Sequence, residues 1–251
     1  MVKESQIEDT DMRKLSWSYG VTTVEGRRST LLPRTLQSLK VAGFDNPRLF
    51  VDGSNDIQSW EKEFGLEVTV RTQNIKTFGN WIMALWELYL RNPAADRYAL
   101  FQDDFVTSLN LKKYLEKTNY PLGGYCNLYT FPQNQSLAPK TKHGGTVDGW
   151  YRSNQMGRGA VALVFSNEAT RVLLTSQHMV ERPRDANRGW KAIDGGIVTA
   201  FKKAGWYEFV HSPSLVQHIG DVSSMGNKPH LKAESFRGEN FDLLSLLSNA
   251  P

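Results

Sequence analysis

Two neighbouring carboxylates, Asp103 and Asp104, stand directly after an apolar run that ends at Phe101. Gln102 precedes the pair and Phe105 follows it, so the two acids lie at the end of a predicted buried strand. Like charges this close repel each other and resist burial. A divalent cation removes that repulsion, and carboxylates combined with substrate phosphates are a common site for such a cation. The sequence therefore favours a metal site here, with a solvated loop as the alternative.

Polar residues also follow other predicted strands. Glu25 and Arg27 come after the first strand, and Asp52 comes after the second. Ligands of open parallel sheets bind at the carboxyl ends of the strands, so these residues and the acidic pair should meet at one edge. We expect a nucleotide or sugar-phosphate site at that edge. The chain has no G-x-G-x-x-G pattern after the first strand and no G-x-x-x-x-G-K-[ST] phosphate loop, which removes the usual support for dinucleotide and P-loop sites.

A further acid, Asp194, stands at the start of a predicted helix and is followed by Gly195 and Gly196. An aspartate in this place can cap the helix. It can also act as a general base, because the two glycines allow a substrate to approach closely. The residues alone leave both interpretations open.

The first part of the chain, which must position these residues, alternates between strand and helix. Gly43 ends the first predicted helix, and Ser29 or Thr30 is its predicted cap. This alternation predicts an α/β domain with a mostly parallel central sheet flanked by helices. The predicted strands are 17–24, 47–52, 66–73 and 98–101, and the predicted helices are 29–43 and 80–92.

The second part is less regular, and its segment 132–159 is rich in Gly, Asn, Lys and Arg, which predicts a long functional or disordered loop. Because no linker divides the chain, we expect one domain over residues 1–225 and a C-terminal extension, 226–251, that packs on it. The predicted strands are 123–131, 160–166 and pieces of 206–220, and the predicted helices are 111–117, 167–179 and 192–205.

Composition excludes several classes of protein. Cys126 is the only cysteine, so neither an intrachain disulfide nor a thiolate metal cluster is possible. Residues 1–14 lack the apolar core of a signal peptide, and no run approaches the roughly 18 apolar residues of a membrane span. We therefore expect no membrane partner and a reducing, cytoplasmic setting. The net charge of +4 is compatible with a polyanionic partner but is ordinary for a soluble protein.

Several segments, taken in order, resemble glycosyltransferases of the GT-A (Rossmann-like) fold. These enzymes carry an acidic triplet of DxD type at the end of a central strand, and this chain has ALFQDDF there. The resemblance covers about residues 16 to 225 and implies a nucleotide-sugar donor, with UDP-sugars favoured. The other similar segments are VTTVEGR at the nucleotide loop, FGNWIMAL before the acidic strand, GRGAVALVFS beyond the acceptor loop, AIDGGIVTAF with the catalytic acid, and PSLVQHIGDVSS with a metal-binding histidine.

The resemblance also implies roles for the acidic triplet and the histidine. Asp104 would bind Mn²⁺ or Mg²⁺ directly, and Asp103 would contact the ribose or a donor sugar hydroxyl. His218 would be a further protein group at the metal, and its imidazole suits Mn²⁺ better than Mg²⁺. Gln102 departs from the acid that is commoner at the first place of the triplet, which puts the metal affinity in question.

For the chemical step, the resemblance favours Asp194 as the general base of an inverting transfer, with a retaining mechanism as the alternative. The implied contacts to the donor are shared among the strand ends and the last motif. Glu25 and Asp52 would contact the base or ribose, while Arg27 would reach the diphosphate or the base. The remaining implied donor contacts are Thr23 in the nucleotide loop and Ser223 and Ser224 beside the phosphates.

The acceptor is the least determined part of the site. Basic residues in the second half are interleaved with aromatic ones, which suits phosphates and bases, although a solvated basic surface is the alternative. The chain also resembles small phage-type enzymes that glycosylate hydroxymethylated pyrimidines such as 5-hydroxymethylcytosine in DNA, and this implies DNA as acceptor and a phage-encoded protein acting in a bacterial host. The rival acceptors are a glycan, a lipopolysaccharide core and a protein, and the rival classes are a nucleotidyltransferase and an inactive nucleic-acid-binding protein. The predicted acceptor-binding residues are Trp150, Arg158 and Trp190.

Overall fold

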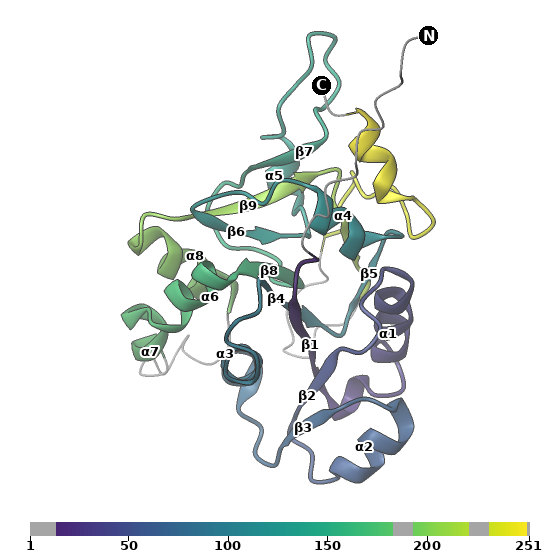
Figure 1. Ribbon diagram of the computed structural model, residues 1–251, viewed down its shortest axis with the longest axis vertical. Coiled ribbons are helices and arrows are strands. Elements are labelled where there is room, and N and C mark those ends of the chain that lie inside the picture. The colour runs from purple at the N-terminus through teal and green to yellow at the C-terminus, as the bar shows by residue number, and fades with distance from the viewer. Residues whose placement is uncertain (1–13, 183–192, 221–230, 250–251) are drawn as a thin grey trace, which may run out of the picture.

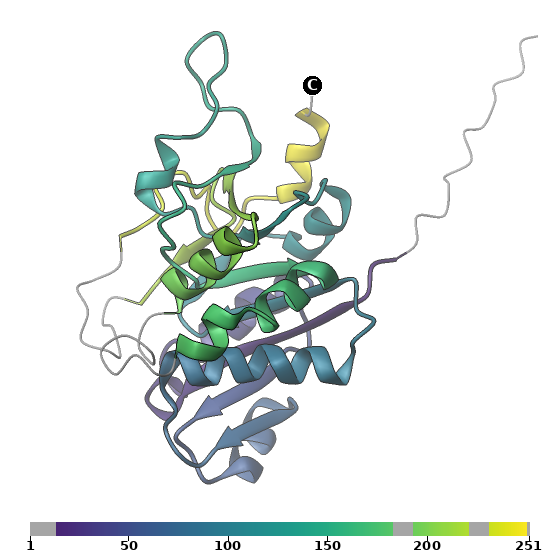
Figure 2. The same ribbon diagram turned by 90° about the vertical axis from the view of Figure 1, so that its left-hand side faces the viewer.

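An eight-stranded sheet with the strand order β3-β2-β1-β4-β8-β6-β9-β7 runs through the molecule. The computed structural model describes residues 14–182, 193–220 and 231–249 (Figure 1). Helices cover both faces of the sheet, as the turned view in Figure 2 also shows. The strands of this sheet are β1 (Trp17–Val24), β2 (Arg48–Asp52), β3 (Val68–Arg71), β4 (Arg97–Gln102), β6 (Gly124–Asn127), β7 (Gly149–Arg152), β8 (Ala162–Ser166) and β9 (Tyr207–Ser212).

The strands from the first half of the chain, β3, β2, β1 and β4, are all parallel. Val21 lies beside Leu49 of β2 and beside Phe101 of β4, and all three side chains are fully buried. Helices cover both faces of a parallel sheet, which is why β2 and β4 are nearly continuous apolar runs. The shared direction places the carboxyl ends of these strands, including Asp52 and Gln102, along one edge. The predicted order of strands and the edge that they share are confirmed.

The second half of the chain extends the sheet in mixed directions. The β4–β8, β8–β6 and β9–β7 pairs are antiparallel, and the β6–β9 pair is parallel. Four of the seven neighbouring pairs are therefore parallel, and the predicted mostly parallel α/β sheet is confirmed. The prediction of a long loop over 132–159 is wrong where α5 (Pro132–Gln135) and β7 lie within it. Elements of four residues carry too little periodicity to be recognised from the sequence.

The two faces of the sheet hold separate apolar layers. Besides α5, the described α-helices are α1 (Leu32–Val41), α2 (Ile57–Phe64), α3 (Lys76–Arg91), α4 (Leu111–Lys117), α6 (Asn167–Leu174), α7 (Gln177–Glu181) and α8 (Asp194–Lys203). On β4, Ala99 and Phe101 face the layer built with α1, α2 and α4, while Tyr98 and Leu100 face the layer built with α3, α6 and α8 (Figure 1). Among the described helices, none is both long and apolar enough to cross a membrane.

The first two helices differ from the sequence prediction at their starts. Leu31 occupies the N-cap position of α1, and no side chain caps the helix, so the predicted cap by Ser29 or Thr30 is wrong. Pro33 lies in the first turn instead, where its fixed φ suits the helix and its missing N–H costs nothing. The helix α2 was not predicted, because Trp60 is its only buried residue and the apolar stripe is correspondingly weak.

A two-stranded sheet follows directly from the acidic turn. β5 (Phe105–Thr107) pairs in antiparallel fashion with β10 (Val216–His218), so a late segment of the chain lies beside the end of β4. The last described element, η3 (Leu243–Asn249), packs on α4 and buries Leu243 completely. The division of the chain at residue 225 stays a prediction.

His211 on β9 is a fully buried histidine that the structure holds in its neutral form. Its Nδ1 lies 2.7 Å from the carbonyl oxygen of Pro213 and therefore carries the proton. Its Nε2 then accepts a hydrogen bond from the Tyr114 hydroxyl at 2.6 Å. Burial lowers the pKa of His211 to about 4, from an ordinary value of 6.5.

This histidine predicts a specific loss of stability in acid. Between pH 6.5 and about 4 the unfolded chain binds a proton at His211 that the folded chain refuses, so the contribution of His211 is complete above pH 6.5 and is lost as the pH falls. The loss attributable to this residue is about 3 kcal/mol at most. Urea unfolding of the wild type and of His211→Gln across pH 7.5 to 4.5 measures it. The free energy of unfolding should fall less steeply in the variant, and parallel curves would contradict the assignment.

Candidate functional site

Asp103 and Asp104 occupy the turn between β4 and β5, and their exposed fractions are only 7% and 8%. The two side chains have different partners. Asp103 Oδ2 accepts a hydrogen bond of 2.6 Å from the Thr23 hydroxyl on β1. Asp104 Oδ2 lies 3.2 Å from Nε2 of His218 and 3.7 Å from a terminal guanidinium nitrogen of Arg27. The parallel β1–β4 pairing positions the first contact, and the β5–β10 pairing positions the histidine.

Burial and mutual repulsion make it unfavourable for Asp103 and Asp104 to be ionised together. Burial raises the pKa of Asp103 to about 7, and the neighbouring charge of Asp104 adds to the rise. The Thr23 hydrogen bond and the Arg27 charge act in the opposite direction on that pKa but do not outweigh the rise. Additional positive charge at this turn would favour the ionised form of both acids.

His218 reaches Asp104 because β10 runs beside β5. In that register His218 lies opposite Phe105, and the backbone N–H of Ile219 donates to the carbonyl oxygen of Asp104 at 2.9 Å. His218 is 5% exposed, so the carboxylate and the imidazole meet in a nearly dry place. Asp104 and His218 thus lie close together, as the resemblance implied. Their role as metal ligands stays a prediction.

The backbone of Gly220 packs so closely on these two groups that a side chain does not fit there. A Cβ at this position would lie 2.9 Å from Cε1 of His218 and 3.0 Å from Oδ2 of Asp104. One carboxylate oxygen and one imidazole nitrogen are a donor set that fits Mn²⁺. The described residues contain no group of three or more His, Cys, Asp and Glu side chains that could hold a metal ion.

Asp194 is the first residue of α8 but is not its cap. Ile193 occupies the N-cap position and no side chain caps the helix, so the capping interpretation is wrong. Oδ2 of Asp194 instead accepts hydrogen bonds from the backbone N–H groups of Gly159 at 2.7 Å and Ala160 at 3.3 Å. Within the described residues, no hydrogen bond reaches Oδ1. One oxygen of this carboxylate is therefore fixed, and the other is available to a ligand.

Tyr129 lies near both the turn that holds Asp194 and the histidine beside Asp104. A Cβ on Gly159 would come within 2.4 Å of the Tyr129 ring, so only glycine allows this packing. The same ring lies 6.5 Å, between centroids, from the ring of His218.

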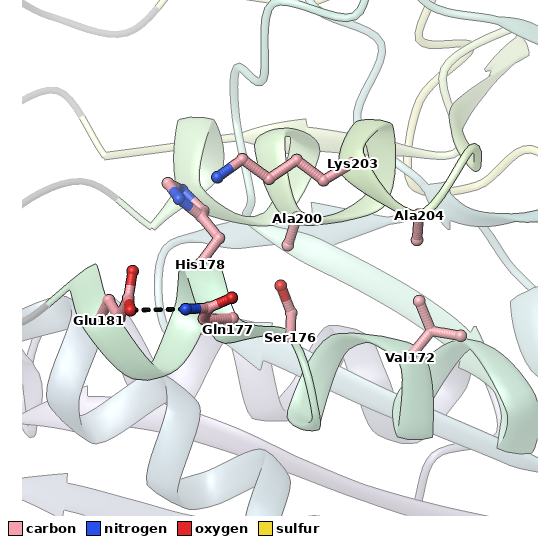
Figure 3. Close-up of a pocket in the computed structure, with 8 residues that line it drawn as sticks. All are labelled: Val172, Ser176, Gln177, His178, Glu181, Ala200, Lys203 and Ala204. Atoms are coloured by element: carbon pink, nitrogen blue, oxygen red, sulfur yellow. Dashed lines mark hydrogen bonds between the residues drawn. The ribbon is translucent and has the colours of Figure 1, made fainter.

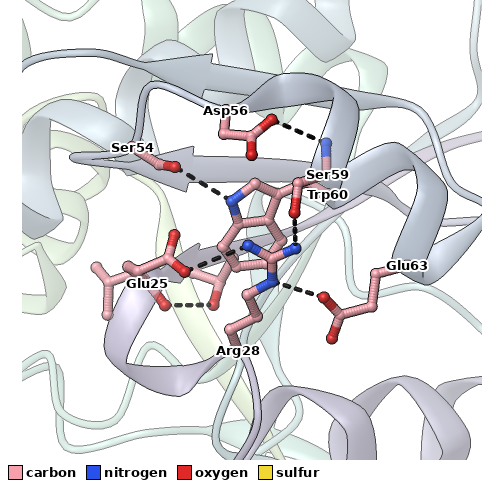
Figure 4. A network of polar contacts seen from close by, with 9 residues as sticks. Glu25, Arg28, Ser54, Asp56, Ser59, Trp60 and Glu63 are labelled. Carbon is pink, nitrogen blue, oxygen red and sulfur yellow. Dashed lines mark hydrogen bonds and ion pairs between the residues drawn. The ribbon is translucent and has the colours of Figure 1, made fainter.

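The two arginines after β1 point in different directions. Arg27 is buried and turned toward Asp104, whereas Arg28 lies over the Trp60 ring at 4.5 Å and pairs with Glu63 at 2.7 Å (Figure 4). Glu25, which was predicted to contact the nucleotide, forms an ion pair of 3.3 Å with Arg28. Arg28 therefore fastens the loop after β1 to α2, which leaves Arg27 as the cation of this loop that faces the acidic turn.

Asp52 is buried at the end of β2, and Oδ1 accepts a hydrogen bond of 2.8 Å from the backbone N–H of Ile75. Burial raises the pKa of Asp52, while hydrogen bonds from Ile75 and Lys76 counteract that rise. The carboxylate thereby anchors the segment that leads into α3. Its predicted contact with a nucleotide stays a prediction.

The predicted acceptor residues are only partly described. Trp150 packs edge-on against His211 with ring centroids 4.9 Å apart, and the Arg158 guanidinium lies 5.5 Å from the centre of the Phe131 ring. The structure gives both residues packing contacts and does not test acceptor binding. Trp190, Ser223 and Ser224 lie outside the described residues.

A cavity of about 350 Å³ lies elsewhere, between α6 and α7 on one side and α8 on the other (Figure 3). His178, Glu181 and Lys203 are among its lining residues. None of the predicted site residues lines it, so the candidate site is the carboxyl edge of the sheet and not this cavity.

Comparison with known proteins gives the fold but no family. No family model matches the chain, and no curated protein is significantly similar to it in sequence. One similar solved structure is the crystal structure of GalNAc-T7 with UDP, GalNAc and Mn²⁺, at 15% identity and a TM-score of 0.52. The match covers 90% of this chain and 45% of that one, so this chain spans less than half the length of that protein.

A second similar structure is that of mannose-1-phosphate geranyltransferase from Thermus thermophilus. It is 15% identical, with a TM-score of 0.47, and the match covers 78% of this chain and 74% of that one. At such identities a match speaks for the fold alone. Together with the strand order, the first match shows that the chain has the predicted α/β, GT-A-like fold.

Sequence reasoning missed two residues that contact the predicted site or its supports. Gly220 follows His218 by two positions, and a glycine so close to a proposed metal ligand was the signal for a close backbone approach. Glu208 is an acid inside the apolar strand β9, where burial of a charge requires a reason.

The close packing of Gly220 on Asp104 and His218 predicts the effect of a single added methyl group. Gly220→Ala should weaken the binding of Mn²⁺ at least about tenfold, because the new Cβ crowds both predicted ligands. Gly26→Ala is the matched control, since a Cβ there meets nothing within 4 Å. Titration of free Mn²⁺ by electron paramagnetic resonance, with UDP at saturation, gives both affinities. Equal affinities for the two variants would rule out a metal at this place.

Proposed function

We propose that this protein is a metal-dependent glycosyltransferase that moves a sugar from a nucleotide sugar, with UDP-sugars favoured, to a hydroxyl acceptor. One observation carries the proposal. Asp104 and His218 meet at 3.2 Å on the carboxyl edge of a GT-A-like sheet, where the backbone of Gly220 packs closely against both groups. A carboxylate and an imidazole in such a place suit a cation that also holds a diphosphate.

The donor would lie along the same edge. Asp104 and His218 would hold Mn²⁺ or Mg²⁺, which when bound neutralises charge on the diphosphate leaving group. Asp103 would accept a hydrogen bond from the ribose or a sugar hydroxyl through Oδ1, because Oδ2 is engaged by Thr23. The similar structure that was crystallised with UDP, GalNAc and Mn²⁺ supports this class of ligand. The remaining proposed donor contacts are Glu25, Arg27, Asp52, Ser223 and Ser224.

Asp194 is the proposed general base of an inverting transfer. Its Oδ2 is held by two backbone N–H groups, and Oδ1 is available to take the proton of the acceptor hydroxyl. The acceptor oxygen then forms a bond to the anomeric carbon as the bond from that carbon to the diphosphate oxygen breaks. The electron pair of the broken bond leaves with the nucleoside diphosphate, and the proton stays on Asp194.

The release of UDP tests the proposal. A panel of UDP-sugars is incubated with Mn²⁺, and UDP is measured with and without acceptors. Asp104→Asn should lower the rate by about 100-fold or more, since the charge on the leaving group is no longer compensated. Asp194→Asn should lower transfer by about 100-fold to 10,000-fold, the usual range for loss of a general base.

The exposed acid Asp45, substituted as Asp45→Asn, is the control and should leave the rate unchanged. If no metal-dependent release of UDP occurs with any donor, the glycosyltransferase proposal fails. Release of pyrophosphate from UTP and a sugar phosphate would instead favour the nucleotidyltransferase alternative.

For the acceptor, we propose DNA that carries 5-hydroxymethylcytosine or a related base, read through Trp150, Arg158 and Trp190. The support is a hairpin that stands out beyond β7, between it and α5 (Figure 1). All of its residues from 139 to 147 are exposed, and they include Lys140 and Lys142 but no acid. The acid that follows, Asp148, is paired with Arg237 at 2.9 Å. Exposed, uncompensated lysines on a projecting arm suit contacts to phosphates.

DNA binding by this hairpin has a measurable salt dependence. Replacing both Lys140 and Lys142 by Ala should reduce the slope of log affinity against log salt by about 2, because each lost phosphate contact accounts for about 0.9. The pair Lys40→Ala and Lys62→Ala, on α1 and α2, is the matched control. Fluorescence anisotropy with duplex DNA measures the slopes, and mass spectrometry detects a hexose on hydroxymethylcytosine. Unchanged slopes, with UDP still released, would point to a glycan, lipopolysaccharide or protein acceptor.

A further inference from the structure

Glu208 is a buried carboxylate that the proposed chemistry does not use. It lies on β9 and is only 2% exposed. Oε1 accepts hydrogen bonds from the Tyr125 hydroxyl at 2.9 Å and the Asn127 amide at 3.1 Å, and Oε2 accepts one from Ser153 at 2.5 Å. Burial of a charge is costly even when it is well paired, and an apolar residue often fills such a place with equal stability. The presence of an acid here therefore calls for a role beyond packing.

One peptide group connects Glu208 to Asp194. The Asn127 amide that donates to Glu208 also donates to the carbonyl oxygen of Arg158 at 3.2 Å. The N–H of the same peptide group, that of Gly159, donates to Oδ2 of Asp194 at 2.7 Å. The peptide between Arg158 and Gly159 is thus held on its oxygen side through Glu208 and on its nitrogen side by the proposed base.

The turn over residues 155–159 also contacts Glu208 and Asp194 elsewhere along its length. Gln155 exchanges two hydrogen bonds, of 2.8 and 3.0 Å, with the backbone of Glu208. A Cβ on Gly157 would lie 2.6 Å from the carbonyl oxygen of Asp194, so this part of the turn packs directly on the start of α8. Gln155 has a φ of 57°, a conformation that is costly for a residue with a side chain and needs support from its surroundings, whereas Gly157 and Gly159 adopt their φ of 65° and 73° without strain.

The charge of Asp194 also affects the pKa of Glu208. Burial raises the pKa of Glu208, its three hydrogen bonds counteract that rise, and the charge of Asp194 raises it further. Glu208 and Asp194 are therefore close enough for their charges to interact, although no hydrogen bond joins them directly among the described residues.

We propose that Glu208 is a positioning residue for Asp194, acting through Asn127 and the peptide between Arg158 and Gly159. Glu208 orients the Asn127 amide, the amide fixes the peptide, and the peptide N–H fixes Oδ2 of Asp194 so that Oδ1 faces the acceptor. This inference rests on the proposed function, since it assigns to Glu208 the alignment of the base in that reaction.

The test is a kinetic split measured on the full chain. Glu208→Gln should lower kcat for transfer by about 10-fold to 100-fold, because one side-chain oxygen in place of two must accept the hydrogen bonds of Tyr125, Asn127 and Ser153. KM for the UDP-sugar and the affinity for Mn²⁺ should stay within about twofold of the wild type, because the donor edge is untouched. His211→Gln is the matched control, since it also removes a buried, hydrogen-bonded polar group from β9 but should leave kcat unchanged.

A double-mutant cycle separates positioning from a general loss of structure. With Asp194→Asn already present, Glu208→Gln should change the residual rate by less than about twofold, because the base that it positions is gone. If the two losses multiply instead, or if His211→Gln lowers kcat equally, Glu208 has only a structural role. Asn127→Ala is the second variant should Glu208→Gln not fold, and it should show the same lack of additivity with Asp194→Asn.

Failure of this inference is distinguishable from failure of the proposed function. If Asp104→Asn and Asp194→Asn leave the release of UDP unchanged, the proposed function itself is wrong. If both variants lose activity while Glu208→Gln keeps the wild-type kcat, the proposed function stands and the positioning role is overturned.

Discussion

The rest of the site depends on one constraint, the burial of two adjacent carboxylates at the carboxyl edge of the sheet. Asp103 and Asp104 cannot share one environment, because burial and mutual repulsion already raise the pKa of Asp103 to about 7. In the fold, the two carboxylates contact different partners. Thr23 on β1 engages Asp103, while His218 and Arg27 gather around Asp104. Each of these partners comes from a different element, and the sheet brings them together.

The β5–β10 pairing is what turns an acidic strand end into a mixed carboxylate–imidazole site. The chain passes through more than 100 residues between the acidic turn and His218, and only the antiparallel register of two short strands returns it to Asp104. The same return brings in Gly220, whose missing side chain allows its backbone to pack closely on both groups. Such a site depends on the pairing of distant strands. The sequence around the acids supplies Asp104, whereas His218 comes from β10.

This division explains what could be predicted from the sequence. The parallel half of the sheet was predictable because β2 and β4 are apolar runs between helical patterns, and their polar ends follow from the direction of the strands. β7 and the contacts of Glu208 were not predictable, because a four-residue strand has little periodicity and the partners of Glu208 lie about 55 to 83 residues away. The role of Asp194 as a cap was excluded only by the backbone, which places Ile193 at the N-cap.

Gln102 fits the same electrostatic constraint. It ends β4 beside Thr22, immediately before the two acids, where the resemblance to GT-A glycosyltransferases makes an acid the commoner residue. A third carboxylate at this point would add repulsion to a turn where Asp103 is already hard to ionise. A neutral amide avoids that cost. The negative charge of the two acids is then compensated by Arg27, by His218 and by the proposed metal ion. With an amide at Gln102, the proposed metal ligands are Asp104 of the triplet and His218 of β10, which makes the β5–β10 pairing the structural basis of the proposed site.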